Sequence, residues 1–462
     1  MTEIGRVPST TLFDAAPPDW NTRGLRMPPS GPLFTAALLA VLLVWSCISA
    51  MLLTELGFNY EQPGGLPFSK IHPGTLLAAG VLILAMAATG RPILWLERVI
   101  AERPGVAVFL LATIGMMAHC IILVGAPFTT FIDTFVGPVI AFWLFKDIGD
   151  ARARMLARII HVVLAVNALV GIAEFASGNR LIPLWIAGEL TTSDWRSSAL
   201  FGHPLSNASI TGCYCIIVML GGGRDIGSIA RTFCLAINTA AMVTFGGRAA
   251  TVMLVAVILL MAAHRFAGYV AGRPFSRAGL VTALLTLPVA IGIVLVLAEA
   301  GYFARFVERF IDDQGSAATR IGMFDLLFSF QWQDLLIAPD LKHVETMQRH
   351  YGLDYGIESV WIAFIIFYGI IPSIVFFAAM FWFLKDVVRS ARRASFWVVL
   401  FFLAVASTSV SLYGKGPQFA ILVMHILILL RRDSVPEPYL AERIGLAMSG
   451  GTIAGRRRLG AY

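Results

Sequence analysis

Residues 104–125 read PGVAVFLLATIGMMAHCIILVG, a run that contains no aspartate, glutamate, lysine or arginine. About 20 apolar residues in a helix cross the ~30 Å hydrocarbon core of a bilayer, so this run by itself predicts a transmembrane helix. The whole chain agrees, because 58% of its 462 residues are hydrophobic and only 14% are charged. The mean hydropathy is +0.78. A single water-soluble core cannot hide so much apolar surface, and lipid is the expected solvent.

Similar apolar runs lie on both sides of this one and predict further spans. They cover residues 33–53, 72–90, 127–145, 155–175, 204–222, 229–246, 248–263, 279–298, 358–384, 396–413 and 417–430. The sequence therefore predicts an all-α, polytopic transmembrane bundle of about 12 spans. Two neighbouring pairs of spans are joined by a few residues rich in glycine, which predicts tight hairpins.

The basic residues predict the orientation of the chain. Most of the 35 lysines and arginines fall in segments that are cytoplasmic if both termini are cytoplasmic, as the positive-inside rule expects. The net charge of +7 is then a topology signal, and no nucleic-acid partner is required. The predicted parts are a disordered cytoplasmic arm (1–32), spans one to nine (33–298), an external loop module (299–357), spans ten to twelve (358–430) and a cytoplasmic tail (431–462).

The external module, residues 299–357, is the feature that departs most from an ordinary membrane protein. It is too polar to cross a bilayer, yet the charge distribution places it outside the cell. Within it, Ile321, Phe324, Leu327 and Phe328 follow i, i+3, i+6, i+7 spacing. This pattern predicts an amphipathic helix that lies on the outer membrane surface or on the bundle.

Ten basic residues lie outside in spite of the topological bias, Lys415 among them, and three arginines of this group are candidates for a binding site. Arg248 follows a two-glycine turn and opens a predicted span, Arg196 lies in the loop before another span, and Arg320 lies on the external helix. An arginine inside the apolar region costs roughly 2.5–3.5 kcal/mol, so it needs an anionic partner or water. Each also has an ordinary explanation: a snorkelling anchor for Arg248, an ion pair with Asp194 for Arg196, and a solvated helix face for Arg320.

Two carboxylates and a histidine complete the candidate site. Glu358 opens the tenth predicted span, where a carboxylate is either a capping charge or a reactive group. Asp133 lies near the outer boundary of the fourth predicted span and is either a partner of an arginine or a polar group in a wet cavity. His203 precedes Pro204 at a predicted helix start. The external segments contain no clear cluster of metal ligands, so neither a metal nor a cofactor is expected.

These residues, in this order and on this side of the membrane, resemble the O-antigen ligase and polysaccharide polymerase superfamily of bacterial envelope proteins. The pieces that carry the resemblance are Arg196 followed by Gly202-His203-Pro204, Gly247-Arg248-Ala249 opening a span, Arg320 on the external helix, and Glu358-Ser359 followed by Tyr368-Gly369-Ile370. The resemblance covers about 196–375, and the twelve-helix plan with a large late periplasmic loop fits the whole chain. It implies the bacterial inner membrane as the location.

The resemblance also implies roles for these residues. Arg248, Arg320 and Arg196 are expected to bind the diphosphate of an undecaprenyl-diphosphate-linked oligosaccharide donor. Glu358 is expected to take the proton from the hydroxyl of the acceptor glycan, with His203 and Asp133 supporting these groups. Lipopolysaccharide ligases typically carry histidine at the position of Glu358, so glutamate favours a polymerase of exopolysaccharide or O-antigen repeat units. Polysaccharide assembly proteins are expected partners.

The chemistry itself is consistent with this interpretation. Planar guanidinium groups suit a leaving group that bears two phosphates, and an ionised glutamate can accept a proton late in an oxocarbenium-like transition state. This predicts inverting, metal-independent transfer by single displacement. The alternatives are an O-antigen ligase that transfers glycan to lipid A core, a polysaccharide-related transporter and a purely structural membrane protein. The chain shows no internal repeat, which argues against the transporter.

Overall fold

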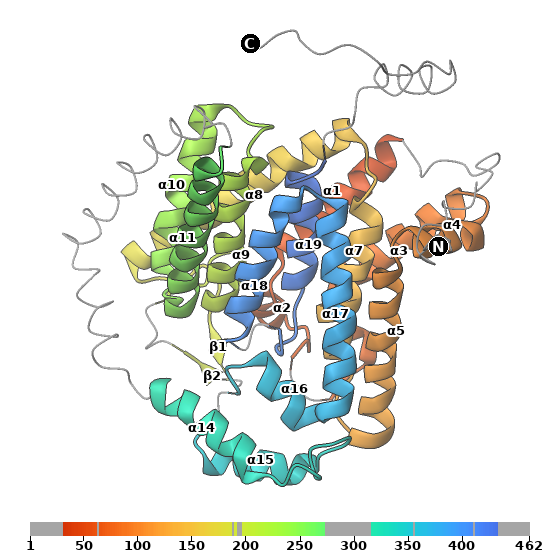
Figure 1. Cartoon of the computed structure of the whole chain (residues 1–462), viewed down its shortest axis with the longest axis vertical. Helices are drawn as coiled ribbons and strands as arrows, with labels where there is room; N and C mark the ends of the chain where they lie inside the picture. Colours follow the sequence, from red (N-terminus) through yellow and green to blue (C-terminus); the bar gives the residue numbers. More distant parts are fainter. Residues whose placement is uncertain are drawn as a thin grey trace, which may run out of the picture.

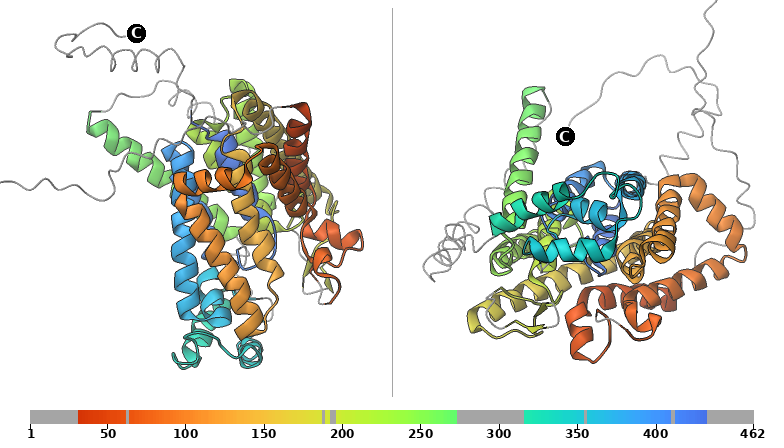
Figure 2. Two further views of the ribbon diagram at one scale, coloured as in Figure 1. Left: turned by 90° about the vertical axis from the view of Figure 1, so that its right-hand side faces the viewer. Right: turned by 90° about the horizontal axis from the view of Figure 1, so that it is seen from below.

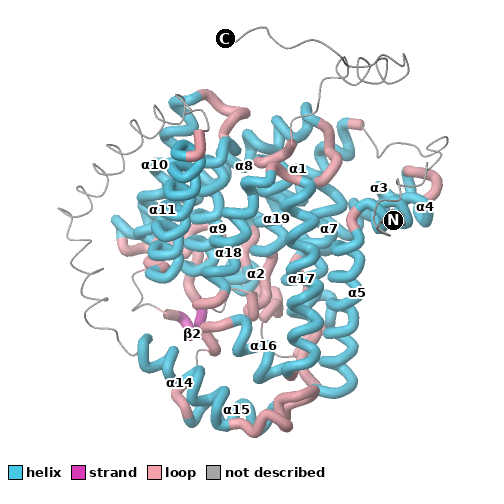
Figure 3. Tube along the Cα trace, in the orientation of Figure 1, coloured by secondary structure: helices cyan, strands magenta, loops and turns pink. Residues whose placement is uncertain are grey.

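The computed structural model describes residues 31–61, 64–186, 189–191, 196–272, 316–353, 356–409 and 412–432. Helices dominate this part of the chain, and a short hairpin of two strands is the exception (Figure 3). The predicted arm up to residue 30, the predicted span 279–298, the beginning of the predicted external module and the tail from residue 433 lie outside the described residues. The fold class predicted from the sequence, all-α with several apolar helices, is confirmed.

The helices follow one another along the chain with short connections (Figure 1). In the first half they are α1 (Pro32–Cys47), α2 (Ala50–Glu55), η1 (Pro67–Lys70), α3 (Pro73–Ala88), α4 (Pro92–Glu102), α5 (Pro104–His119), η2 (Cys120–Val124), α6 (Thr129–Phe131), η3 (Ile132–Val136), α7 (Gly137–Phe145) and α8 (Asp150–Ser177). The antiparallel strands β1 (Trp185–Ile186) and β2 (Glu189–Leu190) follow α8.

The second half of the described chain contains the remaining helices. They are α9 (Pro204–Ile217), η4 (Val218–Gly222), α10 (Ser228–Thr244), α11 (Arg248–Val270), α14 (Ser316–Ser329), α15 (Leu341–His350), α16 (Val360–Tyr368), α17 (Ile370–Ser390), η5 (Arg393–Ser395), α18 (Phe396–Ala406) and α19 (Gln418–Leu429). Every predicted span outside 279–298 contains helix, but 33–53 and 358–384 are each divided between two helices, and several helices are shorter than the apolar run that predicted them.

Proline defines many of the helix starts. Pro32, Pro73, Pro92, Pro104 and Pro204 each occupy the first turn of their helix. The first turn has no intrahelical partner for its N–H groups, so a residue that lacks the N–H costs nothing there and fixes φ in the helical range. These prolines therefore help to set where each helix leaves the preceding loop.

Two helices, α9 and α19, form the centre of the bundle. Nearly every residue of both is buried, and α19 packs against α7, α8 and α9. α9 is rich in small residues, including Ala208, Ser209 and Gly212. Small side chains let helix backbones approach closely, which matters in lipid because packing, rather than exclusion of water, holds such helices together.

Aromatic side chains fill the space between α5, η3 and α17. Phe109 stacks on Phe383 with ring centroids 5.0 Å apart, and Phe135 meets Phe376 edge-on at 4.8 Å. All of these rings are buried. Aromatic pairs in these geometries stabilise a core beyond the area that they bury, so the cluster joins an early helix to one near the end of the chain.

The outer faces of the bundle are apolar, as expected for contact with lipid. Leu111 and Ile122 on the α5 side and Leu259 on α11 are each more than half exposed. Five helices in the described residues are long and apolar enough to cross a membrane, or six if the bent pair α3–α4 is counted as one span. We conclude that the chain is a multi-pass membrane protein.

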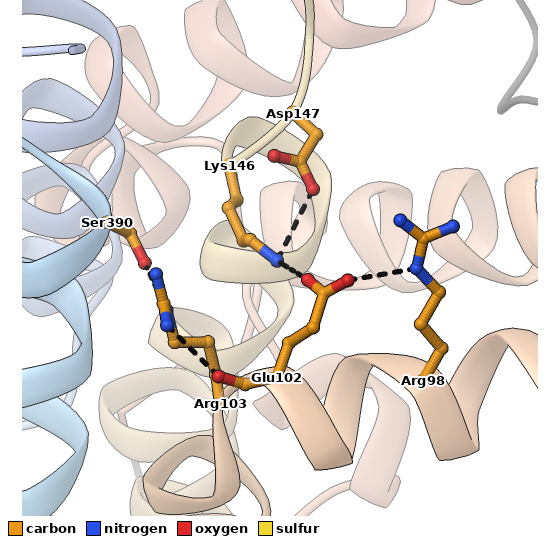
Figure 4. A network of polar contacts seen from close by, with 6 residues as sticks. All are labelled: Arg98, Glu102, Arg103, Lys146, Asp147 and Ser390. Carbon is orange, nitrogen blue, oxygen red and sulfur yellow. Dashed lines mark hydrogen bonds and ion pairs between the residues drawn. The ribbon is translucent and has the colours of Figure 1, made fainter. Parts of the chain in front are cut away.

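α4 departs from the bundle direction and lies across one end of it (Figure 2). It meets α3 at an angle of 109°. Glu102 at its end accepts hydrogen bonds from Arg98 at 2.9 Å and from Lys146 at 2.6 Å (Figure 4). Arg103 donates to Ser390 Oγ at 3.0 Å (Figure 4). The network joins α4 to α7 and α17 through basic residues that the charge pattern assigns to the cytoplasmic side.

The predicted span 358–384 is divided into two helices at Gly369. This residue has φ +96°, a conformation that side chains with a Cβ rarely adopt, and a Cβ there would collide with the carbonyl oxygen of Ile337. Hydropathy could not show this break, because the residues on both sides are equally apolar. α16 packs against α14 and α15 as well as against α17. α14, α15 and α16 lie together at the lower end of the view in Figure 1.

The predicted helix in the external module is confirmed as α14, but its apolar residues divide between two faces. Met323 and Leu326 are buried in a small core shared with α15 and α16. Ile321, Phe324 and Phe328, which belong to the predicted apolar face, are at least half exposed. The helix therefore has one apolar face that packs against α15 and α16 and a second apolar face that is exposed.

We expect Gly369→Ala to destabilise the protein. The new side chain meets backbone and is forced into an unfavourable φ, at a cost of about 1–3 kcal/mol for the conformation alone. Thermal unfolding in detergent would measure this as a lowered Tm. Gly115→Ala in α5 is the control, because a Cβ there meets no atom within 4 Å. Equal Tm values for the two variants would contradict the strain assigned to Gly369.

Candidate functional site

The loop between residues 196 and 203 is fixed by a buried carboxylate. Glu174, near the end of α8, accepts backbone N–H bonds from Leu181 at 2.8 Å, Ser198 at 2.8 Å and Ala199 at 2.9 Å. Asn167, two turns before Glu174 on the same face of α8, accepts a hydrogen bond from the N–H of Leu200 at 3.0 Å. Buried backbone groups in a non-helical loop need such partners, so α8 determines the path of this loop.

The end of the loop packs tightly against the start of the chain's second helix. Gly202 has φ +70°, and a Cβ there would collide with Ser49, the N-cap residue of α2. The next residue, His203, is the N-cap of α9 and accepts the N–H of Leu205 at 3.2 Å. The predicted helix start at His203-Pro204 is confirmed, and the histidine has a structural role there.

The structure brings the segments of Arg196 and Arg248 together. The N–H of Ser197, next to Arg196, donates to the carbonyl of Thr244 at 3.1 Å, just before the two-glycine turn. Arg248 is the first residue of α11, which packs against α9. Both arginines are half-buried. The guanidinium group of Arg180 lies beside the backbone of Arg196. It donates to the backbone carbonyls of Arg196 at 3.1 Å and of Thr191 at 2.7 Å.

Glu358 directly precedes Ser359, the N-cap of α16, and is half-buried. The helix is tied to the segment after α18: Trp361 Nε1 donates to Ser407 Oγ at 2.7 Å, and Phe367 stacks on Tyr413 with centroids 5.1 Å apart. These contacts place the carboxylate beside the end of α18.

The packing of α18 on α11 relates Glu358 to Arg248. His264 of α11 contacts Trp397 at the start of α18, with ring centroids 5.9 Å apart. At 1.5 Å per residue, Arg248 lies about 24 Å from that contact along α11, and Ser407 about 15 Å from it along α18. The two helices are antiparallel, so the start of α11 and the end of α18 lie on the same side of this contact and at the same end of the bundle. The predicted donor-binding arginine and the predicted base therefore share one end.

Arg320 lies in the first half of α14, and its side chain is outside the described residues. α14 packs against α16, so the backbone of Arg320 belongs to the same end of the molecule as Glu358. The helix predicted to carry this arginine is present, but its contribution to a binding site stays a prediction.

Asp133 belongs to a different cluster. It is completely buried in η3, accepts the hydroxyl of Tyr60 at 2.8 Å, and accepts the N–H of His72 at 3.0 Å. The sequence suggested an arginine or a wet cavity as its environment, whereas these partners come from the loop between α2 and α3. The carboxylate holds that loop against the bundle.

Lys415 joins this cluster and was not predicted as a site residue. Its Nζ donates to the carbonyl of Tyr60 at 2.9 Å and lies 4.0 Å from the centroid of the Tyr60 ring. The available signal was its position, because Lys415 is one of the basic residues on the outer side that resist the topological bias. Glu174 also gave a signal, since a carboxylate within an apolar run is a functional hypothesis by default.

Burial of the ammonium group, reinforced by the nearby Lys70, lowers the pKa of Lys415 to about 8, against the opposing effects of Asp133 and Glu61. Burial likewise lowers the pKa of His72 and raises the pKa of Tyr60 well above its ordinary value. The common cause is burial, which disfavours the charged form of each group because it removes the group from water.

A cavity of about 150 Å³ lies between the segment after α1, the 196–203 loop and residues 414–418. His203 and Lys415 both line it, so it links the two clusters.

Among the described residues, no three His, Cys, Asp or Glu side chains come close enough to hold a metal ion. Comparisons of the chain with protein-family models, curated proteins and solved structures found no match.

We expect the amine of Lys415 to react with a small acylating reagent at lower pH than an ordinary lysine. Only the neutral amine is nucleophilic, so labelling should rise through pH about 8, where this group titrates. Mass spectrometry of the detergent-solubilised protein, labelled over pH 6–11, would give the midpoint. Lys415→Arg supplies the blank, and a midpoint near 10.5 would contradict the lowered pKa.

We expect Glu174→Gln to loosen the 196–203 loop. Both carboxylate oxygens accept hydrogen bonds from backbone N–H groups, and glutamine replaces one of these oxygens with an NH₂ donor. The N–H groups that lose their acceptor cost about 1–3 kcal/mol. Hydrogen exchange of Ser198 and Ala199 should become faster and the Tm should fall. Glu97→Gln, an exposed change on α4, is the control. Unchanged exchange in the loop would show that Glu174 does not hold it.

Proposed function

We propose that the protein is a membrane glycosyltransferase that polymerises polysaccharide. It transfers an undecaprenyl-diphosphate-linked oligosaccharide to the hydroxyl of an acceptor glycan at the periplasmic face of the bacterial inner membrane. The observation that supports this most strongly is that the segments of Arg196, Arg248 and Glu358 lie at the same end of the bundle, although they are far apart in sequence.

The start of α11 suits a diphosphate. The first N–H groups of a helix and its macrodipole favour an anion, and Arg248 adds a full positive charge at that position. Arg196 and Arg180 on the adjoining loop supply further guanidinium groups, and Arg320 extends the set from the external module.

The proposed reaction is a single displacement. The acceptor oxygen forms a bond to the anomeric carbon of the donor while the bond from that carbon to the diphosphate oxygen breaks. The bonding electrons leave with the diphosphate, whose growing charge the guanidinium groups neutralise. The carboxylate of Glu358 takes the acceptor proton, and the configuration at the anomeric carbon inverts. No metal is needed for charge neutralisation in this scheme.

The finer topology belongs to the same proposal. It places about twelve spans in the bilayer with both termini in the cytoplasm. Residues 316–357 then lie outside with α16, and the exposed Ile321, Phe324 and Phe328 of α14 face the outer lipid surface, from which a lipid-linked donor would approach.

The proposal predicts that Glu358→Gln lowers polymerisation at least about 100-fold, because removal of a general base typically costs 10²–10⁴ in rate. The assay combines protein purified in nanodiscs, a polyprenyl-diphosphate oligosaccharide and a metal chelator, with product length read on a gel. Arg248→Lys should also reduce the rate, since lysine keeps the charge but loses bidentate contact with phosphate. Glu97→Gln is the control.

Normal product ladders from Glu358→Gln would remove this carboxylate from the mechanism. Transfer of one glycan without elongation would reassign the protein as a ligase. Strict dependence on an added divalent cation would overturn the charge neutralisation by arginine.

A further inference from the structure

We propose that the cavity beside Lys415 is a saccharide-binding subsite, and that it holds the terminal ring of the acceptor glycan. The second half of this statement rests on the proposed function, whereas the first half is independent of it. The cavity lies between the end of α1, the start of α19 and the start of α9, and the 196–203 loop lines one side of it.

The walls combine apolar surface with groups that can hydrogen-bond. Trp45, Met51 and Phe201 contribute apolar surface. Glu61 and Gln418 contribute polar groups on other sides of the space. A sugar ring has the same division, with C–H faces and a rim of hydroxyls, and small-ligand sites are typically apolar with a few placed polar groups.

The polar groups match hydroxyls in particular. A hydroxyl both donates and accepts, so a site for it needs donors and acceptors together. Lys415 is a donor, Glu61 is an acceptor, and the Gln418 amide provides both. Gln418 Nε2 donates to Ser206 Oγ at 2.9 Å, which fixes the amide at the cavity wall. Pre-positioned polar groups of this kind provide specificity without ordering cost on binding.

The charge balance favours a neutral ligand over a phosphate. The positive charges of Lys415 and Lys70 are close to the carboxyl groups of Asp133 and Glu61, and Lys415 Nζ is already bonded to the Tyr60 carbonyl. The segments of Arg180, Arg196 and Arg248 differ in composition, because they bring three guanidinium groups to one place, and that of Arg180 donates to two backbone carbonyls. Donor diphosphate and acceptor sugar would thus occupy separate, chemically distinct places.

The two places are connected by one short loop. Ser197 contacts the turn before Arg248, and Leu200, Phe201 and His203 of the same loop line the cavity. The cavity volume of about 150 Å³ is the size that holds one benzene molecule, that is, an unsubstituted six-membered ring. A glycan seated here by its terminal ring would have its next sugar directed out of the cavity mouth.

Saturation-transfer NMR on the full chain in nanodiscs tests the subsite directly. The probes are the methyl glycosides of glucose, galactose, mannose and N-acetylglucosamine. We expect at least one to bind, and Gln418→Leu to weaken its Kd about tenfold, which corresponds to about 1.4 kcal/mol. Ser206→Ala, which releases the Gln418 amide, should have a smaller effect in the same direction. Gln331→Leu, at an exposed position outside the cavity, is the matched control.

Kinetics then test the acceptor role. Gln418→Leu should raise the KM for acceptor about tenfold and leave the KM for donor unchanged. Glycoside binding should persist in Glu358→Gln, whose loss of polymerisation tests the proposed function separately. Binding of glycosides by a protein that makes no polymer would reject the function and keep the subsite.

Three results would overturn the subsite. The first is that no glycoside binds although polymer forms. The second is equal binding by Gln418→Leu and Gln331→Leu. The third is displacement of a bound glycoside by inorganic diphosphate in a Gln418-dependent manner, which would make the cavity an anion site.

Discussion

The end of the bundle that carries the 196–203 loop depends on the buried carboxylate of Glu174. It accepts three backbone N–H bonds from two stretches of non-helical chain. Unsatisfied N–H groups at this depth would each cost more than a hydrogen bond is worth, so the loop has one well-defined path. That path sets the start of α9 at His203 and brings Ser197 against the turn that precedes Arg248. One side chain on α8 thereby determines the relative positions of two arginine segments.

The other contacts at this end repeat the same principle over longer sequence distances. Asp133 holds the loop of Tyr60 and His72, and Lys415 reaches the Tyr60 carbonyl from the far end of the chain. Trp361 reaches Ser407 in the same way. Each of these hydrogen bonds joins a loop between helices to the helix bundle or to another loop. The helices thus supply a rigid frame, while the polar chemistry is concentrated in the segments between them.

Hydropathy predicted the helices well, because every apolar run in the described residues became helix. It could not locate the break at Gly369, which depends on the carbonyl of Ile337 and not on local polarity. Arg196, Arg248 and Glu358 could be selected because charge is costly near lipid. The setting of Asp133 and the cavity beside Lys415 could not be predicted, since their partners are separated by 73 and 355 positions along the chain.

The short helix α16 is fastened at both of its ends. Its first turn is held by the bond from Trp361 to Ser407. After its last turn, the N–H groups of Ile370 and Ile371 donate to the carbonyls of Leu335 and Leu336, at 2.7 Å and 3.0 Å. The backbone that carries the carboxylate of Glu358 is therefore fixed in position before any ligand binds. This backbone gives up conformational freedom when the protein folds, so in the proposed reaction less entropy would remain to be lost when the acceptor hydroxyl binds.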